Sequence, residues 1–519
     1  MKQLIFSLFI LMQLHATISW NTPTTLSSAS ANVTDHRIVM DSSGNATVVY
    51  VEAGVVKAQV CPLNGSWSGA TTLSGSGASG PSAGVDSSGK VTAVWSTGSV
   101  VQASTYSGGS WSGATTLSSS GTIQSPSIAV RSNGDMVAVW VRNGVVESAT
   151  KLSGDSWGSV NTLSASSSDH PAVAIGANGT VCAIWHTSGG SGDVIMATTA
   201  TVSGSWNTAV SLVSASPAYV HNYPSVSVDL NGNAEAIWYR YQVNGSDDIA
   251  VVINSSSLPN GATAWSTTPT YLSDVGIGNP ANFTARVVHD SFGNALAIWS
   301  ISYDDSSFVV ETAFKSLGQN WTTPGISLTQ SNYSFGVDAS LNSLNDAVVA
   351  YMQFDGTHVL IQGAEATING ILPNLFWTQA TTISSSSNNT APRIASTYAT
   401  NHLYAACSWI DSNSGYNVLQ ASVGSRSTLA PPTSLSVQQT STSYGVFTDY
   451  YNTLTWSASS DASVIGYAIF RNDELIGTVA ASTLTYVEHN TVQNGSVTYT
   501  VTAFDFNLMQ SASATASFP

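Results

Sequence analysis

One pattern recurs eight times along the chain and constrains the fold more than any other feature. Its first part is a Ser-Trp pair before a Thr- and Ser-rich strand, clearest at 19–28, 66–75, 110–119, 156–165 and 205–214, with diverged copies from Trp265, Trp321 and Trp377. Its second part is a hairpin that ends on a large aromatic residue, as in VDSSGKVTAVW at 85–95. A repeat of about 45 residues indicates one supersecondary unit per copy, stacked against its neighbours.

Each repeat contains four strand-like segments, which in the third copy lie at 127–130, 135–140, 144–150 and 156–164. Apolar residues alternate in these segments or run continuously where both faces would be covered. Four-stranded antiparallel units of this length are typical of propeller blades. We therefore predict an all-β fold in which residues 20–424 form an eight-bladed β-propeller. A solenoid of stacked hairpins is the alternative.

The order of the segments favours a closed ring over a solenoid. The chain begins with a Ser-Trp strand, whereas the last repeat, which ends at 416–424, has no such strand after it. We therefore predict that residues 20–27 form the outermost strand of the last blade. This closure would remove a free sheet edge.

Composition limits the class of partner and the compartment. Only 8% of residues are charged, and 13 Lys+Arg against 29 Asp+Glu give a net charge of −16, which argues against nucleic acid and anionic lipid as partners. Residues 1–19 read as a secretory signal peptide, with cleavage after Ser19 or Ala16, and no later stretch reaches transmembrane length. We expect a secreted or cell-surface monomer, periplasmic or extracellular in a bacterium, whose three cysteines are small buried residues.

The repeats stop near Gly424, and 425–432 reads as a linker that Pro431 and Pro432 stiffen. The segment PPTSLSV at 431–437 leads into the C-terminal region. This region, residues 433–519, also contains LTW, GYAIFRND and YTVTAFD. With Trp456, Tyr467 and Tyr499 as core aromatics, this region resembles a fibronectin type III domain. The resemblance implies a β-sandwich that acts as a spacer or adhesion module.

The repeats resemble secreted bacterial surface proteins built from tandem propeller units. No hydrolase, nucleotide or metalloprotease motif occurs. The segment DLNGN at 229–233 has no closing acidic residue of a calcium loop. We therefore predict no cofactor and no metal.

The loops at one face of the predicted propeller hold most of the scarce charge and most of the histidines, Asp169 and His186 among them. Propellers bind ligands over such a face. Tyrosine and phenylalanine rings there could stack on sugars, with carboxylates taking hydroxyl groups. The predicted ligand-binding residues are Arg37, Arg286, Arg393, His170, Tyr223, Tyr239, Tyr241, Phe283, Tyr303, Asp304, Asp305 and Asp355.

The sharpest constellation is an arginine trio. Aligning the first strands on the turn Asp places Arg37, Arg286 and Arg393 at one repeat position, in blades one, six and eight. Three guanidinium groups could clamp a carboxylate or sulfate. The trio resembles the arginine triad of sialidases, although no nucleophilic Tyr with a Glu partner can be assigned. The alternative is that each Arg pairs locally with an Asp of the preceding loop.

These features favour a secreted or surface binding protein that recognises a glycan or protein ligand at one propeller face. One alternative is an enzyme of the glycoside hydrolase, sialidase-like or lyase type at that face, with Asp304, Asp305, Asp355 and Asp411 as candidate carboxylates. Another alternative is a passive scaffold in an envelope layer.

Overall fold

The computed structural model describes residues 17–518 apart from 166, 190–191, 243–249, 261, 263, 267, 278–283, 291, 305–306, 330–332, 343–345, 368–376, 385–387, 400–401, 413–414, 428, 492–495 and 506–509. Every regular element among the described residues is a β-strand. No helix in this part of the chain is long and apolar enough to cross a membrane. The segment of the predicted signal peptide before Thr17 lies outside the described residues.

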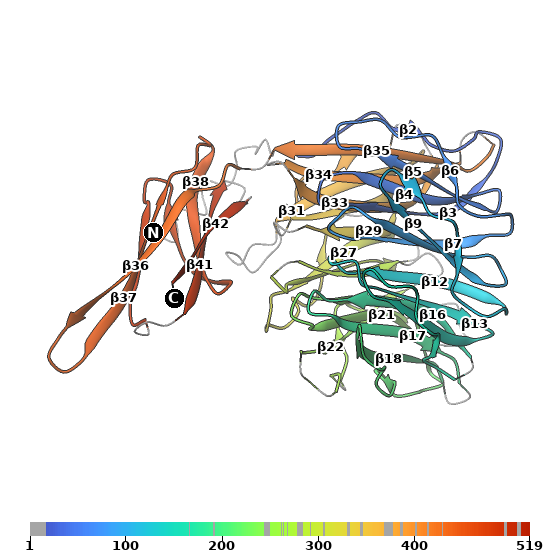
Figure 1. Cartoon of the computed structure of the whole chain (residues 1–519), viewed down its shortest axis with the longest axis horizontal. Helices are drawn as coiled ribbons and strands as arrows, with labels where there is room; N and C mark the ends of the chain where they lie inside the picture. Colours follow the sequence, from blue (N-terminus) through green and yellow to red (C-terminus); the bar gives the residue numbers. More distant parts are fainter. Residues whose placement is uncertain are drawn as a thin grey trace.

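Eight antiparallel sheets of four or five strands lie side by side (Figure 1), and a smaller two-sheet unit follows them in the chain. The first sheet contains β3 (Val33–Met40), β4 (Ala46–Glu52), β5 (Val55–Cys61) and β6 (Thr71–Thr72). The second contains β7 (Ser79–Val85), β8 (Val91–Ser96), β9 (Val101–Ser107), β10 (Ser110–Trp111) and β11 (Thr115–Thr116). The third contains β12 (Ile123–Val130), β13 (Met136–Arg142), β14 (Val145–Lys151) and β15 (Asn161–Thr162), and the fourth contains β16 (Ser168–Ile175), β17 (Thr180–Thr187), β18 (Val194–Thr201) and β19 (Val210–Ser211).

The other four sheets follow the same order. The fifth contains β20 (Tyr219–Val228), β21 (Ala234–Gln242), β22 (Ala250–Leu258), β23 (Thr270–Tyr271) and β24 (Gly276–Ile277). The sixth contains β25 (Ala285–His289), β26 (Ala295–Asp304), β27 (Ser307–Lys315) and β28 (Ile326–Ser327), and the seventh contains β29 (Ser334–Leu341), β30 (Asp346–Phe354), β31 (Val359–Thr367) and β32 (Thr381–Thr382). The eighth contains β33 (Asn389–Ala399), β34 (His402–Asp411) and β35 (Val418–Ser427), together with β1 (Ser19–Trp20) and β2 (Thr24–Thr25).

The turn between the first and second strands explains the recurring Asp and Gly. Asp41 Oδ1 accepts hydrogen bonds from the amides of Ser43 and Asn45, both at 2.9 Å. Gly44 has φ of 87°, a left-handed conformation that a residue with a Cβ adopts only with strain. The same carboxylate pattern recurs in later sheets, at Asp86, Asp229 and Asp290.

One large aromatic residue near the end of each second strand packs onto the preceding sheet. Trp95 lies against Val49 and Val51 of the first sheet, and Trp140 lies against Val94 of the second. The pattern continues around the molecule, because Tyr50 of the first sheet packs against residues of the eighth. All eight side chains are almost completely buried: Tyr50, Trp95, Trp140, Trp185, Trp238, Trp299, Tyr351 and Trp409.

The first strands contact one another in the order β3, β7, β12, β16, β20, β25, β29 and β33, and β33 in turn contacts β3. We call this arrangement the first-strand ring. The three cysteines, Cys61, Cys182 and Cys407, are buried and unpaired, as predicted.

The N-terminal strands belong to the last sheet. Trp20 pairs with Gly424 of β35, and Thr24 and Thr25 pair with Ala421 and Gln420. A Cβ at Gly424 would lie 2.5 Å from the Ile18 Cγ2 atom, so this close approach requires glycine. The two ends of the repeat region therefore hold each other directly.

A buried ionic cluster strengthens this junction. The Arg426 guanidinium donates to Glu365 Oε2 at 2.8 Å and lies 3.3 Å from an oxygen of Asp346. The amide of Ile18 donates to the other Glu365 oxygen at 2.5 Å. Removing one partner would leave a buried charge uncompensated, which is strongly destabilising.

Burial and strand bounds bear on two predicted boundaries. Ile18 is 2% exposed, so cleavage after Ser19 would remove a packed residue, whereas cleavage after Ala16 would keep it. At the other end β35 continues to Ser427, and Arg426 is buried in its ion pairs. The predicted linker at 425–432 therefore begins later, because its first three residues are needed in the sheet.

The C-terminal unit is a sandwich of two sheets (Figure 1). Trp456 and Tyr467 meet edge to face in its core, 5.5 Å between ring centroids, and Tyr499 is fully buried beside them. One sheet contains β36 (Thr433–Ser443), β37 (Thr448–Ser457) and β40 (Thr485–Glu488); the other contains β39 (Glu474–Ala480), β38 (Val464–Arg471), β41 (Val497–Asp505) and β42 (Gln510–Phe518).

Replacing Trp20 tests whether the N-terminal strand stabilises the eighth sheet. Trp20 is half-buried against the core between the seventh and eighth sheets, as Trp111 is against the core between the first and second sheets. We expect Trp20→Ala and Trp111→Ala to lower the free energy of unfolding by similar amounts, roughly 2 kcal/mol each for a half-buried ring. Urea denaturation of both variants measures this. A neutral Trp20→Ala beside a destabilising Trp111→Ala would contradict the role of the strand.

Candidate functional site

Strand register defines one equivalent position in every first strand, opposite the residue that precedes the large aromatic. Its occupants follow one another around the first-strand ring, and we call them the ring positions. They are Arg37, Ser82, Ser127, Ala172, Ser225, Arg286, Asp338 and Arg393.

A β-bulge precedes most ring positions. In six sheets the bulged residue has a positive φ, and in four of these, at Ser125, His170, Tyr223 and Ala391, it is not glycine and precedes a proline. A bulge of this kind bends the strand and redirects the side chain at the extra residue. The bulges therefore present variable side chains where the first strands begin, which we call the entrance end of the ring.

Four consecutive ring positions are charged. Arg286, Asp338, Arg393 and Arg37 come from the sixth, seventh, eighth and first sheets, and we call them the arginine arc. The ring positions of the other four sheets are Ser or Ala. Three cations and one anion thus gather on one side of the ring, in a chain whose net charge is −16.

The local pairing expected for the arginines is present for one of them. Arg37 donates to Asp35 Oδ1 at 3.1 Å, as the alternative predicted. Arg286 instead donates to Asp338 of the next sheet at 3.3 Å. Arg393 has no carboxylate within ion-pair distance among the described residues, and its Nη1 atom donates only to the Pro392 carbonyl.

Arg393 is the least satisfied of the three. Its Nε atom is buried without a hydrogen-bond partner. Burial, and next the positive charge of Arg37, lower the pKa of Arg393, and Arg286 acts in the same direction. The charges of Asp338 and Asp35 oppose this shift only partly. The carboxylates near the arc therefore neutralise its three arginine charges only partly, and an external anion would reduce the repulsion between these arginines.

His36 lies beside the arc. It occupies the place before Arg37 where five other sheets have proline, and its side chain is completely buried. Burial, and next the Arg393 charge, hold the pKa of His36 well below its usual range. The imidazole is therefore neutral, and its burial keeps it from touching a ligand.

A second polar cluster lies on the fourth sheet. Asp169 Oδ1 is 2.9 Å from His170 Nδ1 and 2.6 Å from His186 Nδ1. His170 stands on the bulge and meets the Tyr223 ring edge to face at 5.1 Å. Of these residues the sequence predicted His170 and Tyr223 for the site but not Asp169 or His186. The pairing of Asp169 with His186 across β16 and β17 was the missing signal.

The predicted tyrosines differ in their access to a ligand. Tyr239 is completely buried, and its hydroxyl donates to the carbonyls of Thr284 and Ser300, so its ring offers no face to a sugar. Tyr241 is half-buried, and burial raises its pKa. Tyr303 is 39% exposed.

Tyr303 donates from its hydroxyl to both oxygens of Glu311, at 2.9 and 3.0 Å. The sequence predicted no Tyr–Glu pair. Burial is the largest cause that raises the pKa of each of these two residues. The Glu311 and Asp274 charges also raise the pKa of Tyr303, and the Asp274 charge raises that of Glu311. The pair therefore lies apart from the arginine arc in its electrostatics.

The predicted carboxylates are not gathered into one site. Asp355 is exposed, and its Oδ1 atom accepts from the amides of Thr357 and His358, both at 2.8 Å, which is a turn-capping role. These hydrogen bonds lower the pKa of Asp355. Asp304 ends β26, but its side chain is outside the described part, as are Phe283 and Asp305 entirely.

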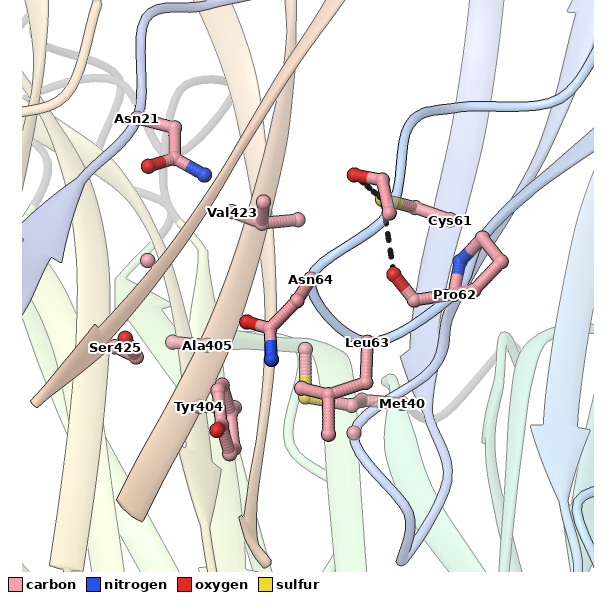
Figure 2. Close-up of a pocket in the computed structure, with 13 residues that line it drawn as sticks. Asn21, Met40, Cys61, Pro62, Leu63, Asn64, Tyr404, Ala405, Val423 and Ser425 are labelled. Carbon is pink, nitrogen blue, oxygen red and sulfur yellow. Dashed lines mark hydrogen bonds between the residues drawn. The ribbon is translucent and has the colours of Figure 1, made fainter.

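One pocket lies at the seam between the first and eighth sheets (Figure 2). It encloses about 230 Å³, and Figure 2 shows Asn21, Asn64 and Tyr404 around it, with the Cys61 thiol at its edge. Cys61 Sγ lies 3.7 Å from the Pro62 carbonyl oxygen and 3.6 Å from that of Gly65. No charged residue lines this pocket, so it lacks the chemistry of the arginine arc.

Comparison with known proteins gives no family for this chain. No protein-family model and no curated protein matches the sequence. Among solved structures it is similar to the polysaccharide lyase Uly1 (10% identity, TM-score 0.40, covering 66% of this chain and 89% of that one). It is also similar to the Hadza microbial sialidase Hz136 (11%, 0.33, 65% and 73%) and to the Penicillium chrysogenum alpha-L-arabinanase (10%, 0.34, 53% and 88%). Scores this low support no argument about function.

His221 lies close to this end of the ring and predicts an acid-sensitive fold. Trp238 Nε1 donates to His221 Nδ1 at 3.0 Å, which requires that nitrogen to be unprotonated. Burial, and next the Arg240 charge, lower the pKa of His221 to about 4. Below pH 6.5 His221 binds a proton in the unfolded chain but not in the folded state. The free energy of unfolding therefore falls as the pH drops toward 4.

We expect this histidine to remove roughly 2 kcal/mol of the free energy of unfolding between pH 7 and pH 5. His221→Asn, which keeps an acceptor for Trp238, should lose correspondingly less over the same interval. Urea unfolding of both proteins at the two pH values measures the difference. Equal losses in the two proteins would show that His221 does not carry the effect.

Proposed function

We propose that the protein binds an acidic glycan at the entrance end of the first-strand ring, through the arginine arc. The observation that carries this proposal is Arg393, a guanidinium between two other arginines with no carboxylate partner among the described residues. An anionic group from a ligand would supply the missing partner. A carboxylate or a sulfate has the acceptor geometry that guanidinium groups recognise in a bidentate manner.

Accessibility supports a ligand at the arc. The Arg37 and Arg286 side chains are 33% and 35% exposed, so each keeps donors for a ligand while it is paired. The overall charge of −16 would repel anions elsewhere on the surface. A local positive potential therefore concentrates anion binding at this place.

Aromatic side chains at the same end favour a carbohydrate over a small inorganic anion. Tyr223 stands on the bulge of the fifth sheet, and Tyr303 is 39% exposed. Tyrosine rings stack on the apolar faces of sugars, and serine hydroxyl groups at neighbouring ring positions can bind sugar hydroxyls.

The architecture that we propose for this function is an eight-bladed β-propeller closed by the N-terminal strand. The cyclic contacts of the first strands and the pairing of Trp20 with Gly424 support it. The sandwich at 433–519 would be a fibronectin type III-like spacer, in keeping with its buried Trp456 and Tyr499. The leader at the N-terminus would direct the protein to the cell surface or the medium, where glycans are presented.

Glycan cleavage at the same end is the second candidate. Asp338 within the arc and Asp35 beside Arg37 both act on the charge of Arg393, and hydrolysis of a glycan uses a pair of carboxylates. Each of them, however, is already bonded to an arginine, and neither is placed as a proton donor. No arginine is among the main causes of the pKa shifts of the Tyr303–Glu311 pair. We therefore propose binding without turnover as the function.

Arg393→Gln separates binding from stability. Removing an unpaired, half-buried cation should leave the melting temperature unchanged or raise it, because the repulsion with Arg37 and Arg286 disappears. Binding should weaken by about tenfold or more, since a charge-assisted contact is lost. A glycan array with neutral, carboxylated and sulfated chains identifies the ligand, and calorimetry then measures the affinity of each variant.

Arg131→Gln is the matched control, because Arg131 lies outside the arc and is paired with Asp135 at 3.1 Å. We expect it to bind the glycan as the native protein does. Native protein that binds no acidic glycan would refute the proposal and leave a protein ligand or a passive scaffold. Release of reducing ends or unsaturated products from a bound chain, abolished by Asp338→Asn, would establish the second candidate instead.

A further inference from the structure

The cluster on the fourth sheet combines three metal-ligating side chains. One ligand atom from each of Asp169, His170 and His186 lies within 4.8 Å of the other two. They come from adjacent strands, because Asp169 and His170 are in β16, and His186 pairs with Asp169 from β17. Two imidazoles and one carboxylate form a donor set that suits divalent transition-metal ions.

The repeats provide an internal comparison for this position. The second sheet has Ser79, Gly80 and Ser96 at the corresponding places, and the third has Gln124, Ser125 and Val141. In the fifth sheet they are Asn222, Tyr223 and Tyr239. The fold therefore does not require Asp or His at these positions. The fourth sheet differs from the second, third and fifth sheets at all three of them.

The backbone preorganises two of the three ligands. His170 has φ of 46° on its bulge, and Pro171 follows it, so the strand cannot easily relax. Asp169 precedes it in β16, directly opposite His186. Zinc bonds of about 2.0–2.2 Å require ligand atoms about 3.3–3.6 Å apart in a tetrahedral site. Asp169 Oδ1 is now 2.9 Å from His170 Nδ1 and 2.6 Å from His186 Nδ1, so these separations would have to widen by about 1 Å or less when the metal binds.

A second carboxylate lies behind the cluster. His186 is 4% exposed, and its Nε2 atom is buried without a hydrogen bond of normal geometry. This nitrogen points to Asp193 Oδ2 at 3.5 Å. When one imidazole nitrogen binds a metal, the other typically donates to a carboxylate, which orients the ring and makes it a better ligand. Asp193 is placed to do this for His186.

The exposure of the cluster leaves room for a further ligand. The Asp169 and His170 side chains are 44% and 42% exposed, whereas His186 forms the buried floor. Three protein ligands with one side open to solvent are typical of metal sites that keep a position for water or a substrate. The Tyr223 ring borders this open side through its contact with His170.

We propose that Asp169, His170 and His186 bind one divalent transition-metal ion of the zinc class, with Asp193 supporting His186 from behind. The open coordination position faces solvent at the entrance end of the ring. There the ion would take an oxygen of water or of a ligand held at that end. This site is independent of the arginine arc, which lies on the sixth, seventh, eighth and first sheets.

The test uses the full, tag-free chain after dialysis against a chelator. Calorimetric titration should show one equivalent of Zn²⁺ with a Kd of ~1 µM or tighter. Substitution with Co²⁺ should give the visible absorption bands of a low-coordinate cobalt site. Asp169→Asn, which keeps the size of this half-exposed side chain, should weaken binding at least about tenfold. Asp193→Asn should weaken it about 10- to 100-fold, as outer-shell changes do.

His358→Ala is the matched control. His358 Nδ1 is 3.8 Å from Asp355 Oδ2 in an exposed pair, without a second histidine beside it in the described structure. We expect this variant to bind metal as the native protein does. The proposal is overturned if the native protein takes up no stoichiometric Zn²⁺, or if Asp169→Asn binds as tightly as His358→Ala while its circular dichroism is native.

Discussion

The structure depends on one repeated interaction, the packing of a large aromatic side chain from each second strand onto the preceding sheet. These rings are the largest fully buried side chains of the repeats. Each one covers an apolar face that its neighbour could not bury alone, as in other repeat proteins. Tyr50 of the first sheet makes this contact with the eighth sheet.

That arrangement places the stabilising contacts between the sheets and leaves the first-strand ring less constrained. Ring positions carry serine in three sheets and alanine in one, and the bulges before them accept glycine, serine, histidine, tyrosine or alanine. Charged side chains can therefore collect there without disturbing the aromatic packing. The arginine arc is such a collection, and its least satisfied member, Arg393, is stable only because the rest of the ring holds it.

The two candidate sites differ in how far each is electrostatically complete. The arc has more positive charge than its own carboxylates neutralise, so its chemistry points outward to an anion. The cluster at Asp169 and His186 has a carboxylate and imidazoles in contact, and its proposed ligand is a cation. The two sites lie on different sheets.

The sequence by itself determined the parts of this protein that depend on local pattern. The strands, the Asp–Gly turns and the shared position of Arg37, Arg286 and Arg393 follow from residue spacing, because period-two alternation and turn chemistry act within a few residues. The same holds for the displaced Ser-Trp strand at the N-terminus, whose absence from the last repeat shows in the order of the segments.

Only the tertiary structure decided what depends on neighbours distant in the chain. Among the described residues, Arg393 has no carboxylate partner, whereas Arg286 donates to Asp338 of the next sheet. The tertiary structure also buried Tyr239 and extended the ordered repeat region to Ile18 and Arg426. The physical reason is that burial and charge pairing depend on which side chains meet across sheets. Residue spacing within one repeat does not indicate which side chains of different sheets contact one another.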